Sequence, residues 1–245
     1  MTFNMDNHQS EAAHSQGAKK LPDSEMVSRN QSLIAAKLVR SKQEIPDYYL
    51  KTNLIVCNLL DWRLANKRPD GKKYSTTSVI INAVSKCLVQ IPKLNAYFVD
   101  NKVFYYSDVN IGVAVSSGDE LFIPVIKKTD TKSIAEIDSE LLTFTEKAKT
   151  QTFEEDDLLG ATFTIASIGA YGIEEFNAII NPLQAGILAI GAIRKVLNIE
   201  EKESIRIRNM VTVTAGFDHR FVNGRLGAEF LNLFKNIIEN EFKTS

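Results

Sequence analysis

Hydrophobic side chains recur every three or four positions in several stretches of the chain, a spacing that predicts amphipathic helices. These stretches are residues 28–45, 76–90, 132–149 and 224–242, with a shorter helix expected over 59–67. Pro46 and Pro92 follow the ends of the first two, and a proline biases the residue before it away from helical backbone angles. Both helices are therefore expected to stop there.

Short apolar runs and a two-residue alternation in the remaining segments predict β-strands. These segments are residues 48–56, 97–106, 110–117, 121–128, 161–169, 184–193 and 204–218. Asp100 and Asn101 stand in the middle of the second segment, where they predict a hairpin turn. Because helices and strands are mixed along the chain, we expect an α/β or α+β fold with one central sheet and helices packed on it.

The composition is that of a folded globular protein and excludes several classes of function. The 245 residues are 44% hydrophobic and 24% charged, and the formal net charge is −1. No block of Lys and Arg supplies the positive patch that nucleic-acid binding needs. No apolar run is long enough for a signal peptide or a membrane span. We therefore expect a cytoplasmic protein with no nucleic-acid and no membrane partner.

The N-terminal segment differs from the rest of the chain. Residues 1–24 are polar and show neither the helical nor the strand period, so we expect a mobile tail ahead of a folded domain over 25–245. This tail contains two of the three histidines, His8 and His14. A pair of imidazoles in a flexible segment is expected to be solvated, and we predict no metal site there.

The two cysteines, Cys57 and Cys87, stand thirty residues apart within apolar segments. They form neither a C-x-x-C motif nor the dense pattern of a disulfide-rich domain. Both are expected to be reduced, buried thiols that hold no metal.

The third histidine, His219, is the candidate catalytic residue. It stands directly after the predicted strand 204–218, at the kind of strand-end loop where rigid scaffolds present reactive side chains. Imidazole is the one side chain whose ordinary pKa lies near neutrality, which suits a general base. A lone histidine is more often structural, so its neighbours in the sequence decide the interpretation.

Residues 218–224 read D-H-R-F-V-N-G. This resembles the D-H-R-x-x-[DN]-G signature of the dihydrolipoyl acyltransferase components of 2-oxo acid dehydrogenase complexes. Further blocks resemble the same family in the same order, at residues 34–49, 105–115, 121–137 and 161–193. The resemblance implies a chloramphenicol acetyltransferase-like fold that assembles as a homotrimer or a multiple of three. It also implies active sites between subunits, with His219 from one subunit and the strand in the 160s from its neighbour.

The resemblance implies roles for the residues of the motif. His219 removes a proton from an acceptor thiol or hydroxyl, which then attacks the thioester of an acyl-coenzyme A co-substrate. Asn223 helps to position the intermediate or the acceptor, and Gly224 starts the last helix. Asp218 and Arg220 make structural contacts that fix the loop, and no metal is implied.

The chain departs from the family pattern at the residue expected to stabilise the oxyanion. The family has Ser or Thr in T-F-T-I-[ST]-x-L-G, whereas this chain has Ala166, followed by Ser167. A shift of one residue along a strand moves a side chain to the other face, so Ser167 is the candidate donor only if a bulge re-aims it. Otherwise a backbone N–H or a water must serve. The family's M-R-K-x-I-A reads N-Q-S-L-I-A at residues 30–35, and its I-P-H ends in Asp47.

Three functions are compatible with these residues, which include no lipoyl-attachment lysine in a D-K-A turn. The first is a free-standing acyltransferase that moves acetyl from coenzyme A to a hydroxyl or thiol of a small molecule or carrier protein, as in natural-product biosynthesis. The second is a core dihydrolipoyl acyltransferase subunit that uses lipoyl groups of another chain. The third is a catalytically silent assembly relative. His219 and Asn223 count against the third, and Ala166 counts for it.

Overall fold

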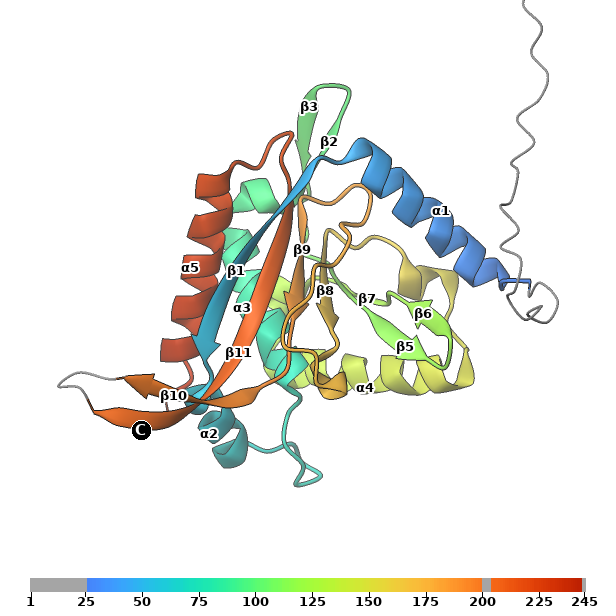
Figure 1. The fold of residues 1–245 in the computed structure, drawn as a ribbon. Coiled ribbons are helices and arrows are strands. Elements are labelled where there is room, and N and C mark those ends of the chain that lie inside the picture. The colour runs from blue at the N-terminus through green and yellow to red at the C-terminus, as the bar shows by residue number, and fades with distance from the viewer. Residues whose placement is uncertain (1–25, 200–203, 244–245) are drawn as a thin grey trace, which may run out of the picture.

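A mixed seven-stranded sheet organises the computed structural model, which describes residues 26–199 and 204–243 (Figure 1). The strands are β1 (Asp47–Ile55), β4 (Ile111–Val113), β7 (Val125–Ile126), β8 (Phe163–Ser167), β9 (Gly186–Ile190), β10 (Arg194–Ile199) and β11 (Ile205–Asp218). Their order across the sheet is β1-β11-β9-β8-β4-β7, and β10 pairs with the first half of β11. β8 runs parallel to both of its neighbours, and the other pairings are antiparallel. The expectation of one central mixed sheet is confirmed.

The five expected helices are all present, and their ends lie within two residues of the predicted ones. They are α1 (Arg29–Glu44), α2 (Cys57–Ala65), α3 (Thr76–Gln90), α4 (Ile134–Thr150) and α5 (Gly224–Asn240). Four begin at a side chain whose oxygen accepts a backbone N–H of the first turn, namely Ser28, Ser75, Ser133 and Asn223. The helix starts are therefore encoded locally, by polar residues just ahead of each apolar stripe.

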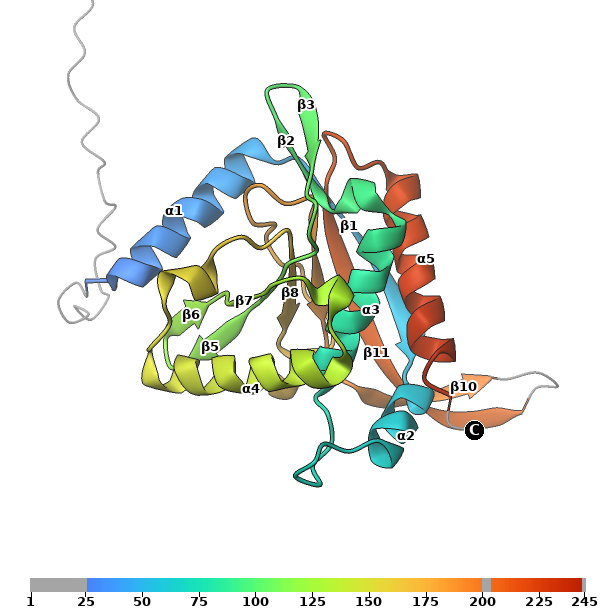
Figure 2. The same ribbon diagram turned by 180° about the vertical axis from the view of Figure 1, so that it is seen from behind.

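The main core lies between one face of the sheet and the helices α3 and α5 (Figures 1 and 2). Phe163 and Phe217 of the sheet pack against Phe230 of α5, and all three rings are fully buried. The other face of the sheet is more polar, with a small buried cluster of Ile45, Ile180 and Ile187, and the chain between β8 and β9 packs on it. Thr164 of β8, for example, is bonded to the side chains of Asn181 and Gln184.

Two differences from the predicted strands concern residues 110–128. The expected strand 110–117 divides at Ala114, after which β5 (Val115–Ser117) pairs with β6 (Glu120–Phe122) in a separate two-stranded sheet. Pro124 separates β6 from β7, since proline has no N–H for a strand ladder.

The expected hairpin at residues 97–106 forms as β2 (Ala96–Val99) and β3 (Lys102–Tyr105), with positive φ at both turn residues.

β10 was not expected, and with β11 it forms a hairpin that projects beyond the helices (Figure 1). Leu197 pairs with Ile207 and Ile199 pairs with Ile205, on one face of this hairpin. All four side chains are between 65% and 75% exposed. We refer to these four residues as the hairpin apolar face.

The predictions for the N-terminal tail, the two cysteines, membrane spans and metal sites concern residues that the structure covers unequally. The tail, with His8 and His14, lies outside the described residues. Cys57 and Cys87 form no disulfide, as expected. Cys87 is buried, and burial raises the pKa of its thiol to about 12, whereas Cys57, at the start of α2, is only partly buried, so the expectation that both are buried is wrong for Cys57. Within residues 26–199 and 204–243, no helix is long and apolar enough to cross a membrane, and no group of three or more His, Cys, Asp or Glu is arranged to hold a metal.

Candidate active site

His219 lies in the loop between β11 and α5, at the end of the sheet where β1 begins. Its backbone N–H donates to the Pro46 carbonyl oxygen at 2.9 Å, which ties the loop to the junction of α1 and β1. The side chain is exposed, and within the described part of the chain its imidazole makes no hydrogen bond. The imidazole is therefore free to exchange a proton with a ligand.

The Tyr48 ring lies beside the His219 imidazole, with 4.6 Å between the ring centroids and a 52° angle between the planes. The Tyr48 hydroxyl donates to the Asn223 carbonyl oxygen at 2.8 Å. Burial raises the pKa of Tyr48 to about 12, so the hydroxyl keeps its proton at neutral pH. Sequence reasoning missed Tyr48, because only the register of β1 against β11 brings it to the motif.

Asp218 and Arg220 form an ion pair on either side of the histidine. Asp218 is 1% exposed, and it accepts from the Arg220 backbone N–H at 3.0 Å and from the guanidinium Nη2 at 2.7 Å. The same guanidinium lies over the Phe98 ring of β2, 4.8 Å from its centroid. This arrangement restrains the backbone on both sides of His219, as a loop-fixing role requires.

Asn223 caps the last helix. Its Oδ1 accepts the Leu226 N–H at 3.0 Å, and its Nδ2 makes no hydrogen bond within the described residues. Since a backbone N–H can only donate, the amide oxygen must face the helix and Nδ2 must face away as a donor. Next to it, a Cβ added to Gly224 would meet no atom within 4 Å, so packing inside this chain does not require glycine there.

Ala166 and Ser167, the two candidates for the oxyanion position, stand at the end of β8. Residues 164–167 pair one for one with residues 187–190 of β9, so this pairing contains no bulge. The Ser167 side chain is exposed and lines a cavity on the helix-covered face, whereas Ala166, on the opposite face, is 9% exposed. The bulge that would re-aim Ser167 into the place of the family hydroxyl is absent.

The register also separates His219 from β8 within one chain. Phe217, two residues before His219, pairs with Gly186 at the start of β9. Ser167 pairs with Ile190 at the end of the same strand. Four strand residues correspond to about 13 Å, so a single chain does not bring His219 to Ala166 or Ser167.

The cavity that Ser167 lines has a volume of about 250 Å³ and lies between the sheet, α2 and the start of α3. Most of its wall is apolar, including Leu59, Ile80 and Ile190. Thr76 and Thr77 add hydroxyl groups from the first turn of α3. Its apolar walls and few polar groups are typical of a small-molecule site.

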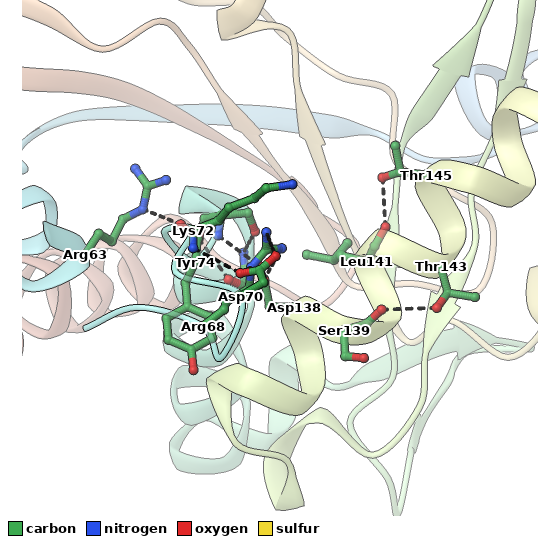
Figure 3. Close-up of polar contacts among 12 residues, drawn as sticks. Arg63, Arg68, Asp70, Lys72, Tyr74, Asp138, Ser139, Leu141, Thr143 and Thr145 are labelled. Atoms are coloured by element: carbon green, nitrogen blue, oxygen red, sulfur yellow. Dashed lines mark hydrogen bonds and ion pairs between the residues drawn. The ribbon is translucent and has the colours of Figure 1, made fainter. Parts of the chain in front are cut away.

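Residues 66–75 form the loop that precedes α3 and its cavity-lining residues Thr76 and Thr77. This loop contains more basic than acidic residues and is held in place by hydrogen bonds and ion pairs (Figure 3). Arg68 is bonded to Asp70 at 2.9 Å and to Asp138 at 3.3 Å, and Asp138 is 1% exposed. Lys67 and Lys73 lie opposite each other in an isolated β-bridge, and neither forms an ion pair within the described residues. Like charges placed directly opposite destabilise a bridge, and an anion bound between them would remove that cost.

Comparison with known proteins gives a consistent result. The family model described as "2-oxoacid dehydrogenases acyltransferase (catalytic domain)" matches residues 20–244. The dihydrolipoyllysine-residue acetyltransferase component of the pyruvate dehydrogenase complex of Rickettsia bellii is 37% identical over 244 residues. That alignment covers 93% of this chain and 58% of the relative, so the chain spans less than two thirds of the relative's length.

Solved structures agree with this fold. A probable dihydrolipoamide acetyltransferase from Listeria monocytogenes has a TM-score of 0.86 and 31% identity, over 94% of this chain and 98% of that one. Dihydrolipoamide acetyltransferase from Azotobacter vinelandii has a TM-score of 0.86 and 25% identity, over 91% and 93%. That structure concerns the catalytic roles of a serine, a histidine and an asparagine, of which the last two are four positions apart, as His219 and Asn223 are.

A chloramphenicol acetyltransferase has a TM-score of 0.52 and 14% identity, which shows the shared fold alone. The expectation of a chloramphenicol acetyltransferase-like mixed sheet with flanking helices is thereby confirmed. The family model covers nearly the whole chain, and the relative from Rickettsia bellii is 37% identical. The chain belongs to the acyltransferase catalytic-domain family of the 2-oxoacid dehydrogenases.

Proposed function

We propose that this chain transfers an acyl group, acetyl, between coenzyme A and a dihydrolipoyl thiol. The observation that carries the proposal is the exposed His219 imidazole, which Tyr48 connects to Asn223 four residues later within D-H-R-F-V-N-G. The relatives reported above are dihydrolipoyl acetyltransferases, which favours the second interpretation of the sequence over the first. A hydroxyl acceptor remains the second candidate, because Ala166 removes the hydroxyl typical of the family.

The proposed reaction uses His219 twice. The imidazole removes the proton from the acceptor thiol, and the thiolate sulfur forms a bond to the thioester carbonyl carbon of acyl-coenzyme A. The tetrahedral intermediate then breaks its bond to the coenzyme A sulfur, and His219 returns the proton to that sulfur. General base catalysis of this kind contributes ~10²- to 10⁴-fold. Asn223 has a role in positioning the acceptor or the intermediate through its Nδ2 donor.

We assign acyl-coenzyme A to the cavity beside Ser167 and to the basic loop at residues 66–75. The apolar wall suits the pantetheine arm, and the hydroxyl groups of Ser167, Thr76 and Thr77 provide its few hydrogen-bonding groups. Lys67 and Lys73 offer an unpaired positive charge for the phosphates. In this arrangement the pantetheine arm passes Ser167 at the end of β8, so that the thioester lies on the opposite face beside Ala166, where a backbone N–H or a water stabilises the oxyanion.

A second copy of the chain completes the proposed site. His219 and Ala166 lie at opposite ends of β9 within one chain, so they meet only across an interface. The hairpin apolar face gives independent support, since four aliphatic side chains this exposed are typical of a surface that a partner covers. We propose a homotrimer or a multiple of three, built from the folded domain that starts near residue 25, with the lipoyl group carried by a separate domain or chain.

Replacing His219 with alanine is expected to abolish transfer without unfolding the protein, because the side chain is exposed. Coenzyme A release from acetyl-coenzyme A and dihydrolipoamide should fall by at least ~10²-fold. The matched control, His8→Ala with His14→Ala, should keep the full rate. A His219→Ala variant as fast as the wild type would refute the mechanism. Wild-type transfer to hydroxyl acceptors alone would favour the first interpretation, and no wild-type transfer to either would favour a silent relative.

The pair Ala166 and Ser167 tests the oxyanion assignment. Ser167→Ala should leave kcat for the thiol acceptor nearly unchanged, because the hydroxyl faces the cavity on the other side of β8. Ala166→Ser should raise kcat, by up to the ~10²-fold that one oxyanion donor supplies. Steady-state kinetics with both substrates measures the two changes. A 100-fold loss in Ser167→Ala would place its hydroxyl on the oxyanion after all.

The basic loop is tested by charge reversal. Lys73→Glu should raise the KM for acetyl-coenzyme A by about tenfold with little change in kcat, because the lost contact is the same in ground and transition states. The effect should shrink at high ionic strength, since salt screens exposed charges. Lys37→Glu, on the exposed side of α1, is the matched control. An unchanged KM in Lys73→Glu would exclude the loop from the donor site.

The role of the hairpin apolar face in assembly is tested by introducing one charged side chain into it. Leu197→Asp should dissociate the oligomer in size exclusion with light scattering, because the interface would enclose an unpaired carboxylate. Transfer activity should be lost with it, since each site needs two chains. Asn198→Asp, on the opposite face of β10, is the control and should stay assembled. A stable and active Leu197→Asp monomer would contradict both the interface and the shared site.

A further inference from the structure

Tyr48 is one side chain in contact with both candidate catalytic residues. Its ring lies beside the His219 imidazole at 4.6 Å between centroids, and its hydroxyl donates to the Asn223 carbonyl oxygen at 2.8 Å. His219 and Asn223 are four positions apart. His219 lies in a loop, whereas Asn223 is the N-cap residue of α5. Tyr48 therefore connects the two residues from a third element, strand β1.

The imidazole has few other restraints. Within the described part of the chain its nitrogens make no hydrogen bond, and the side chain is exposed. The His219 backbone is fixed by the Pro46 carbonyl oxygen, two residues before Tyr48. The short segment from Pro46 to Tyr48, where β1 begins, thus holds the backbone of His219 through a hydrogen bond and its ring through an aromatic contact.

Tyr48 is itself held in one orientation. Its ring packs against Phe217, the residue opposite it in β11, with 5.8 Å between the centroids. On the other side stands Gly227 of α5, where an added Cβ would lie 2.7 Å from the Tyr48 hydroxyl oxygen and 2.9 Å from the Phe217 ring. The helix therefore has room for the tyrosine hydroxyl only because residue 227 has no side chain.

The neighbouring tyrosine shows that the contact is specific to one face of β1. Tyr49 lies on the opposite face, where its hydroxyl is bonded to Asp47 and lies 3.0 Å from the Ala178 carbonyl oxygen. Tyr49 has no ring contact and no hydrogen bond with residues 219–223 among the described interactions. It is therefore a matched control on the same strand, with the same chemistry.

We infer that Tyr48 is a positioning residue, which aims the His219 imidazole with its ring and fixes the start of the Asn223 cap with its hydroxyl. The inference rests on the proposed role of His219 as the general base. A small displacement of a reacting group is enough to slow catalysis by ~10²-fold, so the loss of the ring acts on kcat. Binding of either substrate does not depend on it, because Tyr48 contacts the protein's own residues.

The test compares Tyr48→Leu, Tyr48→Phe and Tyr49→Phe. Tyr48→Leu is expected to lower kcat by ~10²-fold while each KM changes by less than about threefold. Tyr48→Phe keeps the ring and loses one neutral hydrogen bond, so its kcat should fall by ~10-fold at most. Tyr49→Phe should match the wild type. In parallel, the His219 Cε1–H resonance, assigned by its absence in His219→Ala, should lose the ring-current shift of Tyr48 in the leucine variant and keep it in Tyr48→Phe.

Each outcome decides the inference. An unchanged kcat in Tyr48→Leu, or a lowered kcat with an unchanged His219 resonance, would overturn it. If Tyr48→Leu does not fold, Tyr48→Phe decides alone, and the inference fails if the resonance moves as far as in unfolded protein. Wild-type protein with no transfer from acetyl-coenzyme A to dihydrolipoamide would refute the proposed function, while the resonance would still report whether Tyr48 holds the imidazole.

Discussion

The antiparallel pairing of β1 with β11 is the constraint on which the candidate site depends. The nine residues from Asp47 to Ile55 pair in unbroken register with the residues from Met210 to Asp218. This register places Pro46 where it accepts the His219 N–H and Tyr48 where its ring meets the imidazole. A slip of one residue would turn Tyr48 to the opposite face of the sheet and leave the histidine loop without either contact. The chemistry at one end of the sheet is thus set by a ladder of backbone hydrogen bonds along its whole length.

Much of the fold follows from local sequence signals, and α3 shows why. Its apolar stripe, the Ser75 cap and Pro92 beyond its end agree on the same segment, and the helix forms over the predicted residues. β10 reads R-K-V-L-N-I, in which two adjacent apolar residues interrupt the alternation of a strand, and no turn signal precedes it, so it was missed. The division of residues 110–117 into two strands depends on which partner each half finds, and a single sequence does not contain that information.

The candidate site likewise contains some residues that the sequence identifies and others that only the structure identifies. His219 and Asn223 could be identified from the sequence because their motif is contiguous. Tyr48 could not, since its role depends on pairing with a strand more than 150 positions away. The face that Ser167 occupies was open until the register of β8 showed no bulge. The bridge between Lys67 and Lys73 likewise became visible only when the loop geometry placed two like charges opposite each other.

The β10–β11 hairpin has a consequence for the stability and solubility of the protein at low concentration. β10 pairs with β11 on one side only, so its other edge presents unpaired backbone groups next to exposed aliphatic side chains. An exposed edge of this kind can pair with a strand of another protein chain, which leads to aggregation. A specific partner that covers the edge prevents this pairing. If a second copy covers the hairpin, the stability of the fold rises with protein concentration, and a single melting temperature does not describe it. Newly made chains are then most vulnerable to aggregation during the interval before they meet their partners.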